Sequence, residues 1–313
     1  MEPLFLEGVF QDKIWGGTKL RDEFGYDIPS ETTGELWAIS AHPNGPATVK
    51  NGEYAGKSLA ELWDINKEIF GNQEGEVFPL LTKIIDAQND LSVQVHPDDA
   101  YGLANEGELG KTECWYVLSA EPDAEIVFGH NAESKEELRS LIDNGQWDDL
   151  LRSVQVKAGD FFYVPSGTVH AIGSGVMILE TQQSSDTTYR LYDYDRRDDA
   201  GNTRELHIEQ SIDVTTIPHS DQQPTTIINE QDNGTLTTLV SNDFFTVYEW
   251  SLTGEVSFEQ EGLYTLVSVV DGKGSLQIEN DTYELNKGDH FLLPNEIRNW
   301  KIDGNIHLIA AHP

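Results

Sequence analysis

Three segments of the sequence carry side chains whose types and spacing could bind a divalent metal ion. In the first, Ser92-Val-Gln-Val-His96, a strand would point Ser92, Gln94 and His96 to one face and the valines to the other. A buried polar group without a partner costs about 1–3 kcal/mol. The polar face therefore calls for a partner, and a metal ion held by the His96 nitrogen and the Gln94 amide oxygen would supply one.

Glu113 and His170 extend this set of donors. Glu113 would share a strand face with Trp115 and Val117, where a carboxylate is costly unless it is paired or binds a cation. His170 follows a strand that ends at the turn Pro165-Ser-Gly. Taken singly, a strand histidine is more often structural and a lone glutamate more often pairs with Lys or Arg. The ordered combination favours metal, and mixed nitrogen and oxygen donors suit Zn²⁺, Mn²⁺ or Fe²⁺.

The elements that must position these residues are mostly short strands. Runs of β-branched and aromatic residues, separated by Gly, Asn, Asp and Pro, are typical of a barrel or sandwich. They fall at 35–39, 80–85, 91–96, 113–118, 125–128, 160–164 and 176–181, and again at 245–252, 263–270, 275–279, 290–293 and 306–310. Helical insertions are predicted at about 58–72 and 134–151, opened by capping boxes at Ser58 and Ser134, and a third helix is expected at 207–214.

The composition changes near Pro218 and divides the chain into two parts. We predict a catalytic domain over 1–217 that carries the helical insertions, a polar linker over 218–234, and a smaller β domain over 235–313. The expected fold class is mainly β, with two β-barrel or jelly-roll domains.

The composition also excludes several classes of partner. Asp and Glu number 55 against 20 Lys and Arg, so the formal net charge is −35, which repels nucleic acid and anionic membrane surfaces. No apolar run is long enough to cross a membrane, and the acidic N-terminus is unlike a signal peptide. The single cysteine, Cys114, fits a reducing compartment, so we expect a cytoplasmic protein.

The order Gln94-Val-His96, Glu113, Gly159 and Pro165-x-Gly-x-x-His170 resembles the two-motif pattern of the cupin superfamily. Two departures, glutamine in the first ligand place and the long spacing from His96 to Glu113, are features of one cupin family, the type I mannose-6-phosphate isomerases. Further segments that match this family are Ile14-Trp-Gly-Gly, Gly34-Glu-Leu-Trp, Gly110-Lys-Thr-Glu-Cys-Trp and 165–196. The resemblance is strong over 1–197 and looser beyond, and the length is similar to the short bacterial form.

This resemblance implies an enzyme with two cupin-like domains that interconverts mannose 6-phosphate and fructose 6-phosphate, using one Zn²⁺ per chain. The second domain lacks the metal set. The metal ligands would be Gln94, His96, Glu113 and His170. Isomerisation moves a proton between C2 and C1 through an enediol, so the site needs charge stabilisation and a positioned acid or base.

The resemblance also implies roles for residues around the metal. Arg190 and Lys111 would be catalytic, and the residues that bind the substrate would be Ser92, Lys83, Glu35 and Trp15. A cation close to Lys111 could lower its pKa into a useful range. Glu35 or a metal-bound water are rival proton carriers, and the sequence does not choose among them.

Two alternatives belong to other functional classes. Two histidines and one carboxylate could hold Fe²⁺ in a cupin oxygenase, although Gln94 would fill a position that such a site leaves open. A non-catalytic sugar-binding regulatory cupin is the other alternative, against which the presence of Lys111 and Arg190 counts.

A sugar phosphate is an anion, so the acidic chain needs a local basic site. We expect Lys83, Lys111, Arg190 and Arg196 to gather in one cleft, with the excess Asp and Glu on the outer face. A monomer or a weak homo-oligomer is expected.

Overall fold

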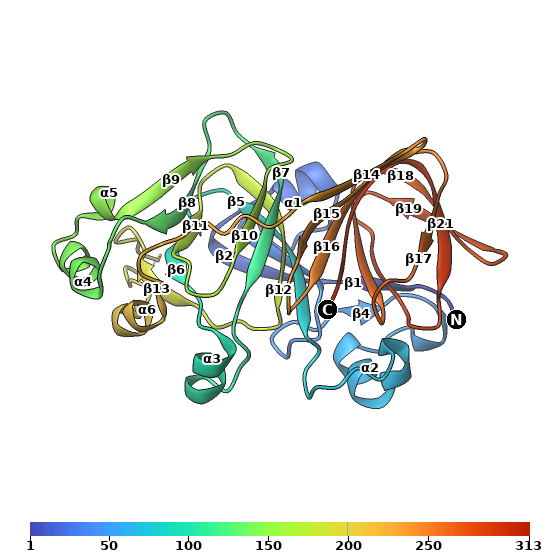
Figure 1. Ribbon diagram of the computed structural model, residues 1–313, viewed down its shortest axis with the longest axis horizontal. Coiled ribbons are helices and arrows are strands. Elements are labelled where there is room, and N and C mark those ends of the chain that lie inside the picture. Colours follow the sequence, from blue (N-terminus) through green and yellow to red (C-terminus); the bar gives the residue numbers. More distant parts are fainter. Residues whose placement is uncertain (199) are drawn as a thin grey trace.

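Three β-sheets make up most of the structure, a computed structural model that describes residues 1–198 and 200–313 (Figure 1). The prediction of a mainly β fold is confirmed. The sheets stack in layers, with a six-stranded sheet between a five-stranded sheet and a ten-stranded one.

The central six-stranded sheet has the order β10-β7-β12-β5-β3-β2. Its strands are β2 (Val9–Gly17), β3 (Thr33–Ile39), β5 (Leu80–Ala87), β7 (Glu113–Ala120), β10 (Phe161–Val164) and β12 (Val176–Gln183). Every position of β3, β5 and β12 is buried, because each face of this sheet packs against another layer. These strands are therefore apolar on both faces, apart from the polar side chains that form the site.

The five-stranded sheet covers one face of the central sheet, in the order β13-β6-β11-β8-β9. Its strands are β6 (Val93–Val95), β8 (Glu125–His130), β9 (Leu151–Gln155), β11 (His170–Ile172) and β13 (Tyr189–Tyr192). Trp115 and Ile178 of the central sheet share a buried cluster with Ile126 and Ile172 of this sheet. The two sheets thus form a sandwich whose inner faces can bring polar side chains together.

The C-terminal strands build the ten-stranded sheet, seen in orange and red on the right of Figure 1. Its main path runs β14-β15-β16-β21-β18-β20-β1-β4, with β17 beside β21 and β19 beside β18. The bounds are β1 (Leu4–Glu7), β4 (Thr48–Val49), β14 (Ile227–Gln231), β15 (Gly234–Ser241), β16 (Thr246–Thr253), β17 (Val256–Glu259), β18 (Thr265–Ile278), β19 (Asp281–Asn286), β20 (His290–Leu293) and β21 (Asn299–His312). This sheet has its own aromatic core, which includes Trp250 and Trp300.

Two strands of this sheet come from the N-terminal part of the chain. Leu4 of β1 lies opposite Leu292 of β20, and Leu6 lies opposite Val49 of β4. The chain therefore crosses between the two predicted domains near its N-terminus as well as through the segment 218–234.

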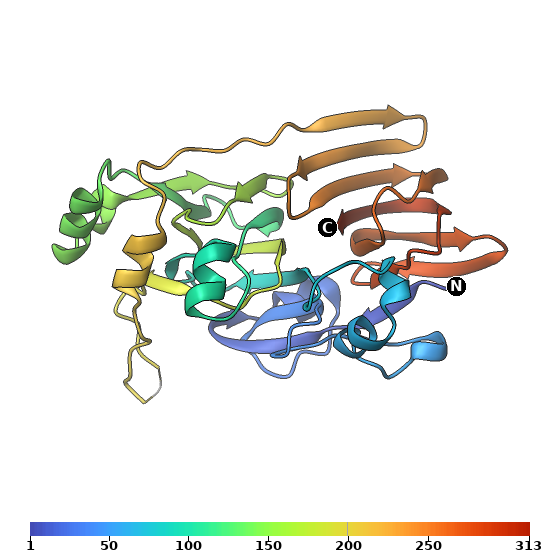
Figure 2. The ribbon, with the colours of Figure 1, turned by 60° about the horizontal axis from the view of Figure 1, so that its bottom comes forward.

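Short helices lie at the ends and outer faces of the sheets (Figures 1 and 2). They are α1 (Lys19–Phe24), α2 (Leu59–Ile65), α3 (Asp99–Asn105), α4 (Lys135–Asp143), α5 (Trp147–Leu150) and α6 (Ile208–Val214), with 3₁₀ turns at Gly52–Tyr54 and Lys67–Phe70. The helices expected within 58–72, 134–151 and 207–214 are thus present. Within 1–198 and 200–313, no helix combines the length and apolarity needed to cross a membrane.

Two local predictions need correction. Ser58 and Glu61 form a complete capping box, but at α4 the Glu137 carboxylate accepts from the Glu133 amide rather than from that of Ser134. The segment 218–234 is not a linker throughout, because it contains β14, which pairs with β15. Every residue of β14 is exposed, so neither an apolar run nor an alternating pattern marks this strand in the sequence.

Candidate active site

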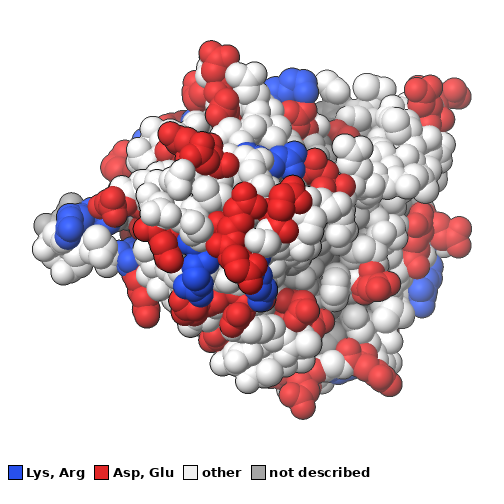
Figure 3. Space-filling model, turned by 60° about the vertical axis from the view of Figure 1, so that its left-hand side comes forward, with Lys and Arg blue, Asp and Glu red and all other residues white. Residues whose placement is uncertain are grey.

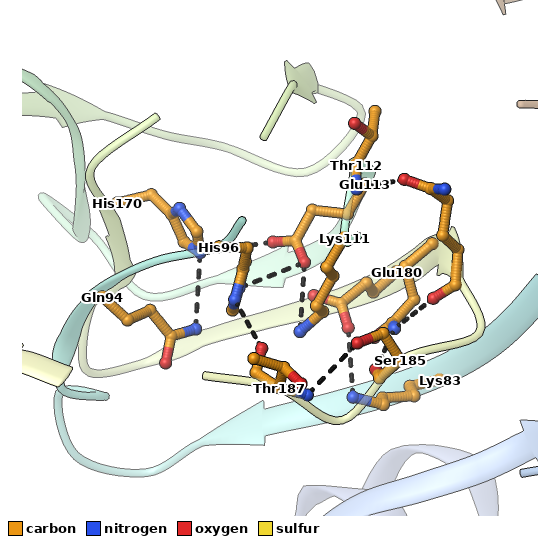
Figure 4. A network of polar contacts seen from close by, with 12 residues as sticks. Lys83, Gln94, His96, Lys111, Thr112, Glu113, His170, Glu180, Ser185 and Thr187 are labelled. Atoms are coloured by element: carbon orange, nitrogen blue, oxygen red, sulfur yellow. Dashed lines mark hydrogen bonds and ion pairs between the residues drawn. The ribbon is translucent and has the colours of Figure 1, made fainter. Parts of the chain in front are cut away.

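Strands of the two facing sheets bring His96, Glu113 and His170 together (Figure 4). The Nε2 atoms of His96 and His170 lie 3.6 and 3.4 Å from the two carboxylate oxygens of Glu113. All three side chains are at most 1% exposed. Among the described residues, His96 Nε2 has no hydrogen-bond partner, and Glu113 Oε2 lies 3.2 Å from the Lys111 ammonium. A buried imidazole lone pair without a donor, beside a carboxylate, is what a bound cation would satisfy.

Backbone carbonyls fix the orientation of both imidazole rings. His96 Nδ1 lies 2.9 Å from the Thr187 oxygen, and His170 Nδ1 lies 2.8 Å from the Thr168 oxygen. A carbonyl only accepts, so each Nδ1 carries the proton and each Nε2 presents its lone pair. Burial, followed by the charge of Lys111, lowers the pKa of His96 well below its usual value. Burial also lowers the pKa of His170, to about 4, so both rings are neutral near pH 7.

Gln94 lies at the edge of the same cluster. Gln94 lies directly opposite His170 in the antiparallel pair of strands β6 and β11. The side-chain amide nitrogen of Gln94 is 3.4 Å from His170 Nε2. An amide at this point can present either its nitrogen or its oxygen, depending on how the group is turned. The structure thus places all four predicted metal ligands in one cluster.

A cavity of about 380 Å³ opens between the central and the five-stranded sheets beside this cluster. The residues predicted to bind substrate all line it, namely Ser92, Lys83, Glu35 and Trp15. The predicted catalytic residues Lys111 and Arg190 line it as well. The structure therefore brings these predicted residues together around one cavity, and the role of each stays a prediction.

The basic residues expected in one cleft are largely there. Five basic side chains line the cavity against three acidic ones: Lys13, Lys83, Lys111, Arg190 and Arg204 against Glu35, Glu180 and Asp186. Figure 3 shows the contrast with the outer surface, where Asp and Glu are spread widely over the face in view and Lys and Arg are few. Arg196 is the exception, because it lies outside the cavity lining, where its guanidinium donates to the Asp90 carbonyl and lies over the Tyr194 ring.

Glu180 on β12 is a site residue that the sequence did not reveal. One of its oxygens lies 3.4 Å from Lys83 Nζ, and the other accepts from the Trp115 indole at 3.1 Å. Burial, followed by the charge of Glu113, raises the pKa of Glu180. A buried carboxylate with a raised pKa, facing a polar cavity, has the properties of a general acid or base.

Lys111 lies 3.2 Å from Glu113 through its ammonium group. Burial opposes its charge, but the carboxylates of Glu113 and Glu180 outweigh this effect and raise its pKa. Lys111 is thus held as a cation at the cavity wall. The lowering expected from the sequence depends on a bound cation, so it stays a prediction.

The sequence of this chain is similar to known protein families and to named relatives. Residues 4–122 match a family model described as the catalytic domain of type I phosphomannose isomerase, and residues 235–313 match the cupin domain of mannose-6-phosphate isomerase. The chain is 61% identical over 311 residues to a mannose-6-phosphate isomerase of Streptococcus mutans, which covers 99% of this chain and 98% of the relative. The chain belongs to the type I phosphomannose isomerase family.

Other members of the phosphomannose isomerase family agree with this assignment over the whole chain. The mannose-6-phosphate isomerase ManA of Bacillus subtilis is 53% identical over 312 residues, which is 99% of both chains. A crystal structure of a mannose 6-phosphate isomerase from B. subtilis superposes with a TM-score of 0.98 at 51% identity and covers 100% of both chains. The family resemblance and the cupin fold predicted from the sequence are thus confirmed.

Arg190 is not held in an ion pair with Asp193, one of the acidic residues close to it in the sequence. Instead, Asp193 binds Arg204 through both oxygens, at 2.6 and 2.8 Å. Within the described residues, the Arg190 guanidinium donates only to the Glu205 carbonyl, at 3.2 Å, and its Nε has no partner. Its guanidinium is therefore available to a ligand in the cavity.

Proposed function

We propose that the protein is a zinc-dependent aldose–ketose isomerase that interconverts mannose 6-phosphate and fructose 6-phosphate. The observation that carries this proposal is that the His96, Glu113 and His170 cluster, in a chain of this family, lies directly behind Gln94 and Lys111, which line a basic cavity. The names of its relatives support the substrate, and the site geometry supports the chemistry.

The donor set fits a divalent metal ion. Two neutral imidazoles and one carboxylate are typical ligands of Zn²⁺, and the Gln94 amide oxygen would be the fourth ligand. When bound, Zn²⁺ would supply Lewis-acid stabilisation of the negative charge that develops on the sugar oxygens. No observation favours the Fe²⁺ oxygenase or the purely sugar-binding alternative over this assignment.

Basic residues of the cavity would bind the phosphate. Arg190 carries an unneutralised guanidinium, and Ser92 on the same wall can donate a hydroxyl hydrogen bond. A planar guanidinium suits phosphate because two N–H groups can bind two of its oxygens. The indole of Trp15 offers an apolar surface to the sugar ring.

Proton transfer between C2 and C1 requires a carboxylate or amine within reach of both carbons. Glu180 has a raised pKa, which suits a group that takes up and returns a proton. Glu35 is less suited, because Lys83 and Lys13 outweigh its burial and lower its pKa. Lys111, held as a cation, would stabilise the enediol oxygens and exchange a proton with them.

The deciding experiment is a coupled assay for fructose 6-phosphate formed from mannose 6-phosphate. The purified protein is measured directly, after treatment with a chelator, and after Zn²⁺ is returned. We expect turnover that is lost with the chelator and restored by Zn²⁺, and little turnover of unphosphorylated mannose. Full turnover in protein shown by elemental analysis to be free of metal would contradict the metal assignment, and no turnover at all would contradict the isomerase assignment.

The cellular context remains a proposal as well. Cys114 is a buried free thiol, which is consistent with a reducing cytoplasm. A monomer or a weak homo-oligomer is the assembly that we propose.

A further inference from the structure

One carboxylate outside the cavity holds a loop that contacts the candidate metal-binding group formed by His96, Glu113 and His170. Oε2 of Glu108, in the segment between α3 and β7, accepts three hydrogen bonds from successive residues of the loop 185–187. The donors are the Ser185 hydroxyl at 3.1 Å, the Asp186 amide at 3.0 Å and the Thr187 hydroxyl at 3.0 Å. Three donors on one oxygen fix both the position and the direction of this short loop.

The loop held in this way makes direct contact with the site. The Thr187 carbonyl accepts the hydrogen bond of His96 Nδ1 at 2.9 Å (Figure 4). Asp186, in the middle of the loop, lines the cavity, and its carboxylate accepts from the Asn44 amide at 2.9 Å. Glu108 is therefore two hydrogen bonds away from the imidazole through Thr187, whose hydroxyl donates to Glu108 and whose carbonyl accepts from His96.

The second oxygen of Glu108 connects the loop to the opposite wall. It lies 3.5 Å from Nε2 of the buried His42 ring, which packs edge-on against Trp37 with ring centres 5.5 Å apart. The Trp37 indole donates to Glu35 in the cavity at 2.7 Å. Contacts from both oxygens of one carboxylate thus reach two sides of the same site.

We propose that Glu108 is a positioning residue that sets the proton position and the orientation of the His96 ring through the Thr187 carbonyl. If the loop moves, the carbonyl no longer holds the Nδ1 proton, and the Nε2 lone pair is no longer fixed toward Glu113 and His170. The consequence for metal binding rests on the proposed function, whereas the consequence for the imidazole tautomer does not. Loss of an outer partner of a metal-binding histidine typically costs 10–100-fold in metal affinity.

The ionised carboxylate is suited to this task. Burial works against the charge of Glu108, but the Asp186 amide and the loop hydroxyls outweigh it and lower its pKa. A glutamine could offer one amide oxygen to the donors but would turn an NH₂ group toward His42 or the loop. We therefore expect Glu108→Gln to be intermediate between the native protein and Glu108→Ala.

The test measures the tautomer and the metal affinity separately. Long-range ¹H–¹⁵N NMR of the metal-free protein reports the tautomer of each histidine, and His96→Gln identifies the His96 signal. We expect a pure Nδ1–H form in the native protein and a mixture in Glu108→Ala. Competition with a chromogenic chelator should show a Kd for Zn²⁺ that rises about tenfold in Glu108→Ala.

A matched control and a second variant keep the proposal falsifiable. Glu74 and Glu108 both line one groove on the surface, and Glu74 is an exposed carboxylate there. Because Glu74 makes no hydrogen bond to the described residues of the loop 185–187, Glu74→Ala should change neither the tautomer nor the Zn²⁺ affinity. Thr187→Val removes one of the three donors without changing charge, and it replaces Glu108→Ala if that variant does not fold. An unchanged His96 tautomer in Glu108→Ala overturns the proposal. If Glu108→Ala does not fold, an unchanged His96 tautomer in both single variants, Thr187→Val and Glu108→Gln, overturns it. If the native protein bound no Zn²⁺, the proposed function would fail while the tautomer still tested the role of Glu108.

Discussion

The ammonium of Lys83 lies 3.4 Å from the carboxylate of Glu180, and the two residues are direct neighbours across the paired strands β5 and β12. Both side chains are 4% exposed. A shift of one residue in this pairing would turn one of them to the opposite face of the sheet. The site therefore depends on the register of the central sheet as much as on the identity of its residues.

Removing one member of this buried pair should be costly for stability. We expect Glu180→Ala to lower the free energy of unfolding by about 3 kcal/mol, because the buried Lys83 ammonium loses the carboxylate with which it forms an ion pair. The double variant Lys83→Met/Glu180→Leu should recover much of that loss. Urea denaturation of the native protein, Lys83→Met, Glu180→Leu and the double variant measures the coupling, and additive effects would show that the two charges do not interact.

The group His96, Glu113 and His170 gives a prediction on both Zn²⁺ binding and isomerase activity. His170→Ala removes one of the two imidazoles, so we expect it to abolish both stoichiometric Zn²⁺ and isomerase turnover. Metal content is measured by elemental analysis and turnover by the coupled assay. His219→Ala serves as a control because His219 belongs to no such cluster within the described residues, so this variant should keep its metal. Retention of full activity in metal-free His170→Ala would refute the assignment.

Lys111 should act on turnover with the metal still in place. We expect Lys111→Met to lower kcat by about 10²-fold or more, since the cation that would stabilise the enediol oxygens is lost. Zn²⁺ content should remain at one per chain. Lys135→Met, at an exposed position on α4, is the matched control. Native turnover by Lys111→Met would remove this residue from the mechanism.

Arg190 should affect substrate affinity more than the rate of reaction. We expect Arg190→Gln to raise KM for mannose 6-phosphate about 10–100-fold, which corresponds to the loss of one charge-assisted hydrogen bond of about 1.5–3 kcal/mol. The change in kcat should be smaller. Inhibition by inorganic phosphate should weaken in parallel, and an unchanged inhibition constant would place the phosphate elsewhere.

His290 in the ten-stranded sheet gives a prediction on pH and stability. Its ring is hydrogen-bonded to Tyr26 and Ser268, and burial lowers its pKa to about 3. Below about pH 6.5 this histidine is protonated in the unfolded chain but stays neutral in the folded protein. The free energy of unfolding therefore decreases as the pH is lowered from about 6.5 toward 3. Between pH 7 and 5 this effect amounts to about 2 kcal/mol. Urea denaturation at both pH values should show that His290→Gln loses about that much less than the native protein, and equal losses would contradict the assignment.

The metal cluster could be predicted because the sequence carries its signal locally. His96 and Gln94 share a strand face within three residues, and His170 follows a turn that Pro165 and Gly167 specify. Chemistry that depends on types and short spacings can be read without knowing which strands are neighbours. Strands such as β5 and β7 were predictable for the same reason, because apolar and β-branched runs mark them locally, whereas the exposed β14 was not.

Glu180 could not be found in this way. Its strand is buried on both faces, so no alternation distinguishes the face that meets the cavity. Its significance comes from Lys83 and Trp115, which reach it only through the pairing of β5, β12 and β7. Lys13 and Arg204 were missed for a similar reason, since only the folded chain brings them to the cavity.

The position of β1 has a consequence for how the protein is made. The strand Leu4–Glu7 is synthesised long before its partner β20, which lies at His290–Leu293. At about 5–20 residues per second, translation leaves this strand without that partner for roughly 15–60 s. During that time Leu4 and Leu6, which are buried in the finished protein, are available to chaperones. Closure of the ten-stranded sheet between β1 and β20 must therefore wait until β20 has been synthesised, however early the central layer forms.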